Sequence, residues 1–345
     1  MLDHAIVVAT RNRLDMLRVT LPLMVHQTRT ASRIIIVDRS DDHEAVRSYC
    51  EELAADAPMP FEVVYGEQAN LPAQRNQGLD LVTEPVVMYP DDDSMWYPDT
   101  AEQVMAVYEA DTNQRFGAVS ATPVQTPPTQ TVTEVPLRKL RFTNITFVMD
   151  LRNRLETALV PQPFEVYGRH RISQLAPAAR ADGLDDYPLI ETIAGYRMSY
   201  RTDVAKALRF DPVLGSRIGY ATHEDKDMGL RVLASGSLMA AAPAGLVFHN
   251  VAPGQRTGGF SYGFFHIFNY LYICKKVFPE HSRALAVTHR YLAYKVFLYG
   301  LRRSDQYALD VHRGAKAAMS EYETIMKADT GALADVYAEI CARHL

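Results

Sequence analysis

The sequence predicts an α/β fold, in which a mostly parallel central sheet carries helices on both faces and precedes a C-terminal helical extension. Two observations in the first third favour this fold: short continuous apolar runs typical of buried parallel strands, and apolar residues at helical spacing between those runs. A third is the helical pattern that continues from Gly258 to the end. Alternation of strands and helices at this pace implies right-handed crossovers between parallel strands.

The expected elements follow one another closely in the first 121 residues. Strands are expected at Ala5–Ala9, Arg33–Asp38, Phe61–Tyr65, Val86–Tyr89 and Gly117–Ala121. Helices are expected between them, around Leu14–Val25, Val46–Leu53, Pro72–Leu81 and Ala101–Tyr108. Proline at the start of the third of these helices is well tolerated, because the first turn needs no hydrogen bond from its nitrogen.

The pattern changes after Ala121. A stretch rich in proline and threonine, Thr122 to Pro136, indicates a loop or an edge excursion. The residues from Leu137 to Tyr187 carry no clear pattern, and a second compact stretch runs from Ile193 to Asn250. Helices are then expected at Tyr291–Arg303 and near Gly314–Ala342.

Composition excludes several classes of protein. The chain has 345 residues, 48 % hydrophobic, and a net charge of −5, so no basic bias indicates a nucleic-acid partner. Its three cysteines are odd in number and lack metal-ligand spacing, which favours reduced thiols in a cytoplasmic protein. The start lacks the pattern of a signal peptide, and no apolar run reaches the ~20 residues that span a bilayer.

One aromatic segment, Gly258 to Phe278, has two interpretations. His266, Asn269 and the pair Lys275 and Lys276 interrupt its apolar residues. A core helix is the simpler interpretation. The alternative is an interfacial helix that lies on the inner membrane face, which would make the protein a peripheral membrane protein.

Three adjacent aspartates, Asp91 to Asp93, follow the expected strand Val86–Tyr89. Ligands of parallel sheets bind beyond the carboxyl ends of the strands, where Asp38 also lies. On an extended backbone Asp91 and Asp93 point to the same side and Asp92 to the other. Two carboxylates ~4 Å apart repel by ~4 kcal/mol at an effective dielectric near 20, and a divalent cation reverses the sign. The cluster therefore indicates a metal–diphosphate site, with a solvated turn before a helix N-cap as the alternative.

Five motifs in order carry a resemblance to a known family. They are VVATRNRLDML, IIIVDRSDD, NLPAQRNQGLD, YPDDDSMWYPD and THEDKDMGLRV, between Val7 and Val232. In this order and spacing the chain resembles family-2 glycosyltransferases with the GT-A fold. The resemblance implies a Rossmann-like central sheet, a nucleotide-sugar donor and transfer with inversion at the anomeric carbon.

The resemblance also implies roles for residues of the first half. Thr10, Arg11 and Arg13 border the nucleobase and ribose, Asp38 accepts a hydrogen bond from the base or ribose, and Arg75 faces the diphosphate or the base. Asp91 and Asp93 are the DxD pair, with Asp93 the direct metal ligand, and Asp92 lies near the ribose or is structural. Arg39 replaces a second acid found in many relatives and Arg11 an aromatic residue, so the nucleotide stays open.

In the second half, the motif THEDKDMGLRV supplies a candidate base. Sugar transfer needs a carboxylate that accepts the proton of the acceptor hydroxyl, and the resemblance assigns this role to Asp225. Glu224 is then expected to orient the acceptor or the base. The alternative is structural: Thr222 and Asp225 form a capping box, and Asp227 pairs with Arg231 four residues later.

Three further residues are candidates with structural alternatives. His249 ends an apolar run and is a candidate metal ligand or diphosphate contact, or a locally bonded histidine; an imidazole ligand favours Mn²⁺ over Mg²⁺. Arg256, in a glycine-rich loop, either closes over the phosphates or is solvated. Trp96, the single tryptophan, either stacks on the acceptor sugar or packs in the core.

These expectations combine into one hypothesis. Residues 1–121 form the nucleotide-sugar-binding half of a GT-A domain, 122–255 its acceptor-binding half and 256–345 a helical extension. The enzyme moves a sugar from a UDP-, GDP- or dTDP-sugar to a hydroxyl acceptor, a lipid-linked or surface glycan being slightly favoured, in polysaccharide or glycoconjugate biosynthesis. A nucleotidyltransferase is disfavoured because no glycine-rich loop follows the first strand. A non-catalytic nucleotide- or sugar-binding partner of a membrane-associated assembly is the other alternative.

Overall fold

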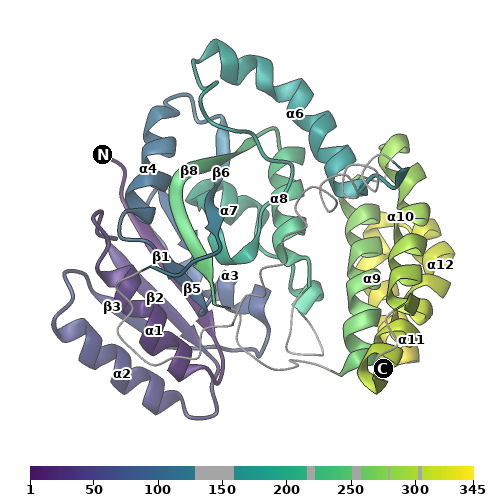
Figure 1. Cartoon of the computed structure of the whole chain (residues 1–345), viewed down its shortest axis with the longest axis horizontal. Coiled ribbons are helices and arrows are strands. Elements are labelled where there is room, and N and C mark those ends of the chain that lie inside the picture. The colour runs from purple at the N-terminus through teal and green to yellow at the C-terminus, as the bar shows by residue number, and fades with distance from the viewer. Residues whose placement is uncertain (129–158, 216–221, 251–257, 279, 302–304) are drawn as a thin grey trace. The chain divides into compact units, whose positions relative to one another are not determined.

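The computed structural model describes residues 1–128, 159–215, 222–250, 258–278, 280–301 and 305–345 (Figure 1). The chain forms two compact units. Unit 1 comprises Met1–Arg138, Arg171–Gly215 and Glu224–Pro253, and unit 2 comprises Lys139–His170, Ser216–His223 and Gly254–Leu345. Each unit has its own core and is described by itself.

Unit 1 contains an eight-stranded mixed sheet with the order β3-β2-β1-β4-β7-β6-β8-β5. The strands are β1 (His4–Thr10), β2 (Arg33–Asp38), β3 (Phe61–Tyr65), β4 (Val86–Tyr89), β5 (Ser94–Trp96), β6 (Phe116–Val124), β7 (Met198–Arg201) and β8 (Leu238–His249). Strands β3, β2, β1 and β4 are parallel, and so are β6 and β8. β7 runs antiparallel to both of its neighbours, and β5 runs antiparallel to β8. The predicted α/β class is confirmed, and the parallel half is the part that the apolar runs indicated.

Helices cover both faces of this sheet. The helices and 3₁₀ turns of unit 1 are α1 (Leu14–Val25), α2 (His43–Ala55), α3 (Leu71–Leu81), α4 (Thr100–Ala110), η1 (Gly195–Arg197), α7 (Thr202–Leu208), η2 (Pro212–Gly215) and α8 (Glu224–Ala234). Helix α6 (Pro163–Ala181) is divided between the units, and its residues from Arg171 on belong to unit 1. Alternate residues of each strand face opposite sides. Ile6 and Val8 therefore join the core with α1, α2 and α4, whereas Ala5 and Val7 join the core with α3, α7 and α8.

Helix α3 shows how the sequence fixes an element that carries a site residue. The side chain of Asn70 caps it by accepting a hydrogen bond from the Ala73 N–H over 3.1 Å, and Pro72 stands in the first turn as predicted. Gly78 allows the helix to lie close to β1, since a Cβ there would meet Val7 Cγ1 at 2.4 Å. This close packing brings Arg75 to the carboxyl end of the sheet.

Unit 2 is helical. It contains α9 (Gly259–Val277), α10 (Ser282–Leu301), α11 (Gln306–Ser320), α12 (Tyr322–Lys327), η3 (Thr330–Ala332) and α13 (Leu333–His344). The single helix expected near Gly314–Ala342 is therefore divided among α11, α12 and α13. None of the described helices is long and apolar enough to cross a membrane.

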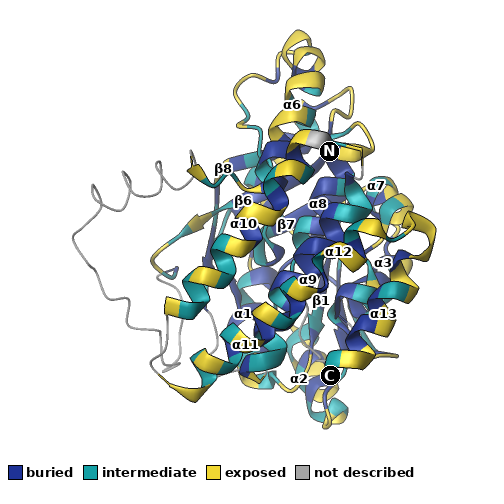
Figure 2. Cartoon of the chain, turned by 90° about the vertical axis from the view of Figure 1, so that its right-hand side faces the viewer, coloured by how far each residue is buried: buried dark blue, intermediate teal, exposed yellow. Residues whose placement is uncertain are grey.

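The aromatic segment from Gly258 to Phe278 is the core helix of unit 2. From Gly263 to Cys274 every residue of α9 is buried except the half-buried His266 (Figure 2). Its backbone touches that of α11, because Gly263 and Gly314 carry no side chains at the crossing: a Cβ at Gly263 would meet the Val311 carbonyl oxygen at 1.9 Å. The interpretation of this segment as an interfacial helix is wrong, because its aromatic side chains pack inside the unit.

Candidate active site

The three aspartates lie in a tight turn between β4 and β5. The Ser94 N–H donates to the Asp91 carbonyl over 3.0 Å, and this bond closes the turn. The Asn250 N–H, just after β8, donates to the Asp93 carbonyl over 3.0 Å. Because Ser94 pairs with His249 in the sheet, the end of β8 lies beside the turn.

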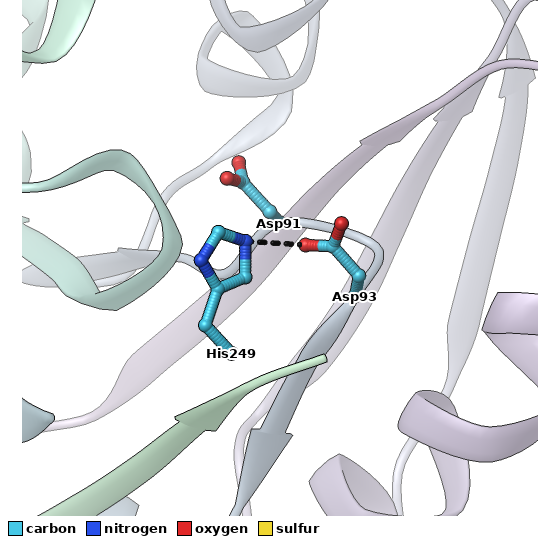
Figure 3. A group of neighbouring side chains, drawn as sticks. All are labelled: Asp91, Asp93 and His249. Atoms are coloured by element: carbon cyan, nitrogen blue, oxygen red, sulfur yellow. Dashed lines mark hydrogen bonds and ion pairs between the residues drawn. The ribbon is translucent and has the colours of Figure 1, made fainter. Parts of the chain in front are cut away.

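Asp91, Asp93 and His249 form a cluster of candidate metal ligands (Figure 3). One ligand atom from each lies within 4.8 Å of the others. Nε2 of His249 lies 3.0 Å from Oδ1 of Asp93, whose side chain is only 1 % exposed. Two carboxylates and one imidazole suit a divalent ion such as Mn²⁺, and two acids this close together, Asp93 buried and Asp91 half-buried, favour a cation between them. The donor set fits a metal site, and the predicted convergence of Asp91 and Asp93 matches this geometry.

Asp92 points the other way and anchors the turn. Its carboxylate accepts a hydrogen bond from the Thr10 hydroxyl over 2.9 Å and pairs with Arg13. Its carbonyl accepts a bond from the Thr20 hydroxyl over 2.9 Å. Burial raises the pKa of Asp92 to about 7, although the positive charge of Arg13 opposes that shift. These contacts favour the structural role of Asp92 over a ribose contact.

Arg13 connects this anchor with the metal cluster. Its guanidinium also lies 3.2 Å from Oδ2 of Asp93. Burial alone would lower the pKa of Arg13, but Asp92 and Asp93 outweigh it and the net shift is upward. Arg13 is thus a fixed positive charge at the edge of the cluster.

Arg75 joins two motifs across the site. One amino nitrogen donates to Oδ1 of Asp91 over 2.6 Å and the other to Oε1 of Glu224 over 3.0 Å. The Arg75 side chain is 2 % exposed, so the geometry does not favour its predicted direct contact with a diphosphate or base. Burial raises the pKa of Glu224 to about 7, the negative charge of Asp225 adds to this, and Arg75 opposes it.

Asp225, the candidate base, lies at the start of α8, and two backbone N–H groups donate to its carboxylate. Oδ2 accepts from the Gly195 N–H over 2.9 Å, and Oδ1 accepts from the Lys226 N–H over 2.7 Å. The side chain is 17 % exposed, so the carboxylate is fixed and still reachable from solvent.

The structural alternative for the same motif is half correct. Asp227 pairs with Arg231 over 2.7 Å, as predicted. The capping box is wrong, because α8 begins at Glu224 and the residue before it, His223, has a φ of 67°. Thr222 stands two residues before the helix, and its hydroxyl donates to the Phe265 carbonyl of α9 over 3.4 Å.

The turn η1 belongs to this site and was missed by the sequence interpretation. Besides the bond from Gly195 to Asp225, the ring of Tyr196 stacks on His249 with a centroid distance of 4.3 Å and an interplanar angle of 9°. The only signal in the sequence was a glycine beside an aromatic residue. This signal is too common to assign a role.

Two predicted residues have contacts that favour other roles. The buried Asp38 accepts hydrogen bonds from Ser40, over 3.0 Å from the N–H and 2.5 Å from the hydroxyl, and its other oxygen lies 2.7 Å from His43 Nδ1. These contacts do not favour the predicted hydrogen bond between Asp38 and a nucleobase or ribose. Trp96 is 4 % exposed and lies in the core cluster of one sheet face, which favours core packing over an acceptor platform.

Two predicted residues remain, Arg11 and Arg256. Arg11 is exposed, next to Asn12 with a φ of 53°. Arg256 lies outside the described residues. The structure thus brings together Thr10, Arg13, Arg75, Asp91, Asp92, Asp93, Glu224, Asp225 and His249 in unit 1.

Comparison with known families agrees with this arrangement. Residues 5–161 match the sequence profile described as glycosyl transferase family 2. The chain carries a family-2 glycosyltransferase domain. The match contains Thr10, Arg13, Arg75 and the three aspartates, and the enzyme class is glycosyltransferase. No curated protein sequence matches the chain significantly.

Solved structures share the fold of this family-2 glycosyltransferase domain. The mannosyltransferase PcManGT from Pyrobaculum calidifontis, in complex with GDP-Man and Mn²⁺, is 13 % identical with a TM-score of 0.50, over 100 % of this chain and 89 % of its own. TarS 1-349 from S. aureus, in complex with UDP-GlcNAc, is 10 % identical with a TM-score of 0.56, over 98 % and 90 %. GalNAc-T7, with UDP, GalNAc and Mn²⁺, is 12 % identical with a TM-score of 0.56, over 100 % of this chain and 58 % of its own. At these identities the likeness shows the GT-A fold.

Proposed function

We propose that the protein is an inverting, metal-assisted glycosyltransferase that moves a sugar from a nucleoside-diphosphate sugar to a hydroxyl acceptor. The observation that carries the proposal is the Asp91–Asp93–His249 cluster, which the turn η1 connects to the candidate base Asp225. Such a reaction needs a cation for the leaving diphosphate and a carboxylate for the attacking hydroxyl. This site offers residues for both tasks.

The donor is a UDP-, GDP- or dTDP-sugar. The complexes of PcManGT with GDP-Man and of TarS with UDP-GlcNAc support this class without choosing within it. Asp91, Asp93 and His249 would hold Mn²⁺ or Mg²⁺, which would supply positive charge where the diphosphate leaves. Arg13 adds a fixed charge beside the cluster, and Thr10, Arg11 and Arg256 are proposed to border the nucleotide.

Asp225 accepts the proton of the acceptor hydroxyl while that oxygen attacks the anomeric carbon in line with the departing diphosphate. In-line attack inverts the configuration. The backbone donors Gly195 and Lys226 keep the carboxylate in one orientation, which a general base requires. Glu224 is 7 % exposed and paired with Arg75, so it acts on the site through Arg75.

The acceptor is proposed to be a glycan or glycoconjugate, with a lipid-linked molecule favoured by one surface of unit 2. Helix α10 contains no acidic residue, and Arg283, Arg290, Phe297 and Leu301 are exposed at helical spacing along it. Basic and apolar side chains on one face suit an anionic membrane surface. Sedimentation with anionic vesicles, compared with neutral ones and with Phe297→Ser, tests this peripheral contact.

Incubation with a panel of nucleotide sugars, followed by mass spectrometry, tests the function itself. We expect slow hydrolysis of one donor that requires Mn²⁺ or Mg²⁺ and stops with EDTA. Thermal-shift titration with UDP, GDP and dTDP should show metal-dependent stabilisation by the matching diphosphate. Release of pyrophosphate from a nucleoside triphosphate would favour the nucleotidyltransferase instead. Absence of any response to nucleotides would favour the non-catalytic alternative.

A further inference from the structure

The turn η1 contacts both the candidate base and the candidate metal cluster. The Gly195 N–H donates to Asp225 over 2.9 Å, and the next residue, Tyr196, stacks on His249. The Tyr196 carbonyl accepts a hydrogen bond of 2.8 Å from the hydroxyl of Ser94, which directly follows Asp93. Three successive contacts thus link the candidate base, the histidine ligand and the aspartate turn to one short segment.

Stacking restricts how the imidazole of His249 can turn. The two rings are nearly parallel, at 9°, so rotation of the imidazole about its bond to Cβ would drive it into the phenol ring. In the observed orientation Nε2 faces Oδ1 of Asp93 at 3.0 Å. The groups that orient a ligating histidine commonly change metal affinity when they are removed.

The neighbouring residue, Arg197, also contacts the ring of Tyr196. The Arg197 guanidinium lies 5.6 Å from the centroid of the Tyr196 ring. Its Nη1 donates to the Ser120 hydroxyl over 2.9 Å and to the Ala121 carbonyl over 2.6 Å, both on β6. The stack is therefore supported by the central sheet.

The position before the stack, Gly195, is crowded. A Cβ on Gly195 would lie 3.3 Å from Nη2 of Arg75 and 3.6 Å from Oδ2 of Asp91. The first distance is shorter than ordinary van der Waals contact. Glycine therefore lets the turn approach the site closely enough for Tyr196 to reach His249.

We propose that Tyr196 is a positioning residue that sets the metal affinity of the site by holding His249, and that η1 ties this orientation to Asp225. The inference rests on the proposed function, because it assumes that His249 is a metal ligand. It assigns to Tyr196 no contact with substrate.

Binding of Mn²⁺ to the full chain, followed by the electron paramagnetic resonance signal of the free ion, tests this proposal without turnover. Tyr196→Leu removes the stacking ring, and we expect Mn²⁺ affinity to fall by about 10-fold. Tyr196→Phe keeps the ring and should bind Mn²⁺ within about 2-fold of the wild type, since stacking needs no hydroxyl. Tyr196→Ala is a second unstacked variant should the leucine variant not fold.

A double-mutant cycle with His249→Ala separates positioning from a general loss of structure. If Tyr196 acts through His249, Tyr196→Leu should weaken Mn²⁺ binding no further in the His249→Ala background. The inference is overturned if Tyr196→Leu lowers Mn²⁺ affinity equally in the wild-type and His249→Ala backgrounds. It is also overturned if Tyr196→Leu and Tyr196→Ala both bind Mn²⁺ with wild-type affinity. In either case the proposed function stands. A wild-type chain that binds no Mn²⁺, alone or with UDP or GDP, overturns the proposed function and the inference with it.

Discussion

The guanidinium of Arg75 donates to the carboxylate of Glu224 over 3.0 Å, although the two residues are 149 positions apart. The same guanidinium also donates to Asp91. One buried cation therefore connects the aspartate turn after β4 with the start of α8. The candidate metal site and the candidate base are parts of one network of charges, so a change in Arg75 should affect both.

Loss of this cation should strongly destabilise unit 1. Arg75→Met leaves Glu224 buried without its partner, and removal of one member of a buried ion pair typically costs about 3–5 kcal/mol. Urea unfolding followed by the fluorescence of Trp96, which lies in this unit, measures the loss. Arg209→Met is the matched control, because its pair with Asp80 is exposed on both sides and should contribute no more than about 1 kcal/mol. A loss no larger in Arg75→Met than in this control would contradict the prediction.

Removal of the buried aspartate of the cluster should abolish metal-dependent donor binding. Asp93→Ala removes a carboxylate that is 1 % exposed and faces His249. We expect the Mn²⁺-dependent rise in melting temperature with nucleoside diphosphate to disappear. The exposed Asp56→Ala should retain that rise. Retention of the full response by Asp93→Ala would place the metal elsewhere.

Asp225→Asn should separate binding from chemistry. The amide keeps the shape of the side chain but cannot take the proton from the hydroxyl of the acceptor. Turnover should therefore fall by about 10²–10⁴, with the affinity for the nucleotide sugar nearly unchanged. Steady-state rates and a diphosphate titration on the same preparation give both quantities. Asp203→Asn is a matched control, since Asp203 is an exposed acid in the first turn of α7. Near-normal turnover in Asp225→Asn would remove Asp225 from the base role.

The sequence predicted the parts of the site that depend on strand ends. A buried strand followed by acids places them at the carboxyl edge of the sheet, and Asp91 and Asp93 converge there, although across a tight turn and not on the extended backbone that the prediction assumed. The partners of those acids were not predictable in the same way. Arg75 is directed at Glu224 rather than at an open cleft, and the ring that holds His249 comes from a turn without a motif.

The capping box failed for a similar reason. Thr222 and Asp225 have the spacing of a capping box, but the backbone at His223 adopts a positive φ and the helix begins one residue later. Spacing reports which side chains are near in sequence. It does not report the backbone conformation that decides whether they meet.

Acid should weaken unit 1 through His4 at the start of β1. Burial lowers the pKa of His4 to about 4, with the nearby positive charge of Arg29 acting in the same direction. The imidazole of His4 takes up a proton more readily in the unfolded chain than in the folded one. The contribution of neutral His4 to the stability of unit 1 is therefore complete above about pH 6.5 and is lost as the pH falls toward 4. The loss reaches about 3 kcal/mol at the lower pH.

The variant His4→Phe isolates that contribution. It removes the titrating group, so the stability of unit 1 should fall less between about pH 7 and pH 4.5 than in the wild type. Urea midpoints followed by Trp96 fluorescence give the comparison. The exposed His26→Phe should keep the wild-type slope. Parallel slopes for His4→Phe and the wild type would show that His4 does not carry the effect.

A methyl group between α9 and α11 should destabilise unit 2. A Cβ at Gly314 would lie 2.0 Å from the Phe260 carbonyl oxygen, and backbone atoms cannot move aside as a flexible side chain can. Gly314→Ala must therefore push the helices apart, at a cost of about 1–3 kcal/mol or more, as for other overpacked cores. Gly258→Ala, where a Cβ meets nothing within 4 Å, is the matched control at the start of α9. Faster hydrogen exchange confined to the amides of α9 and α11 in Gly314→Ala is the expected result, and exchange rates equal to those of Gly258→Ala would show that the crossing is looser than the structure indicates.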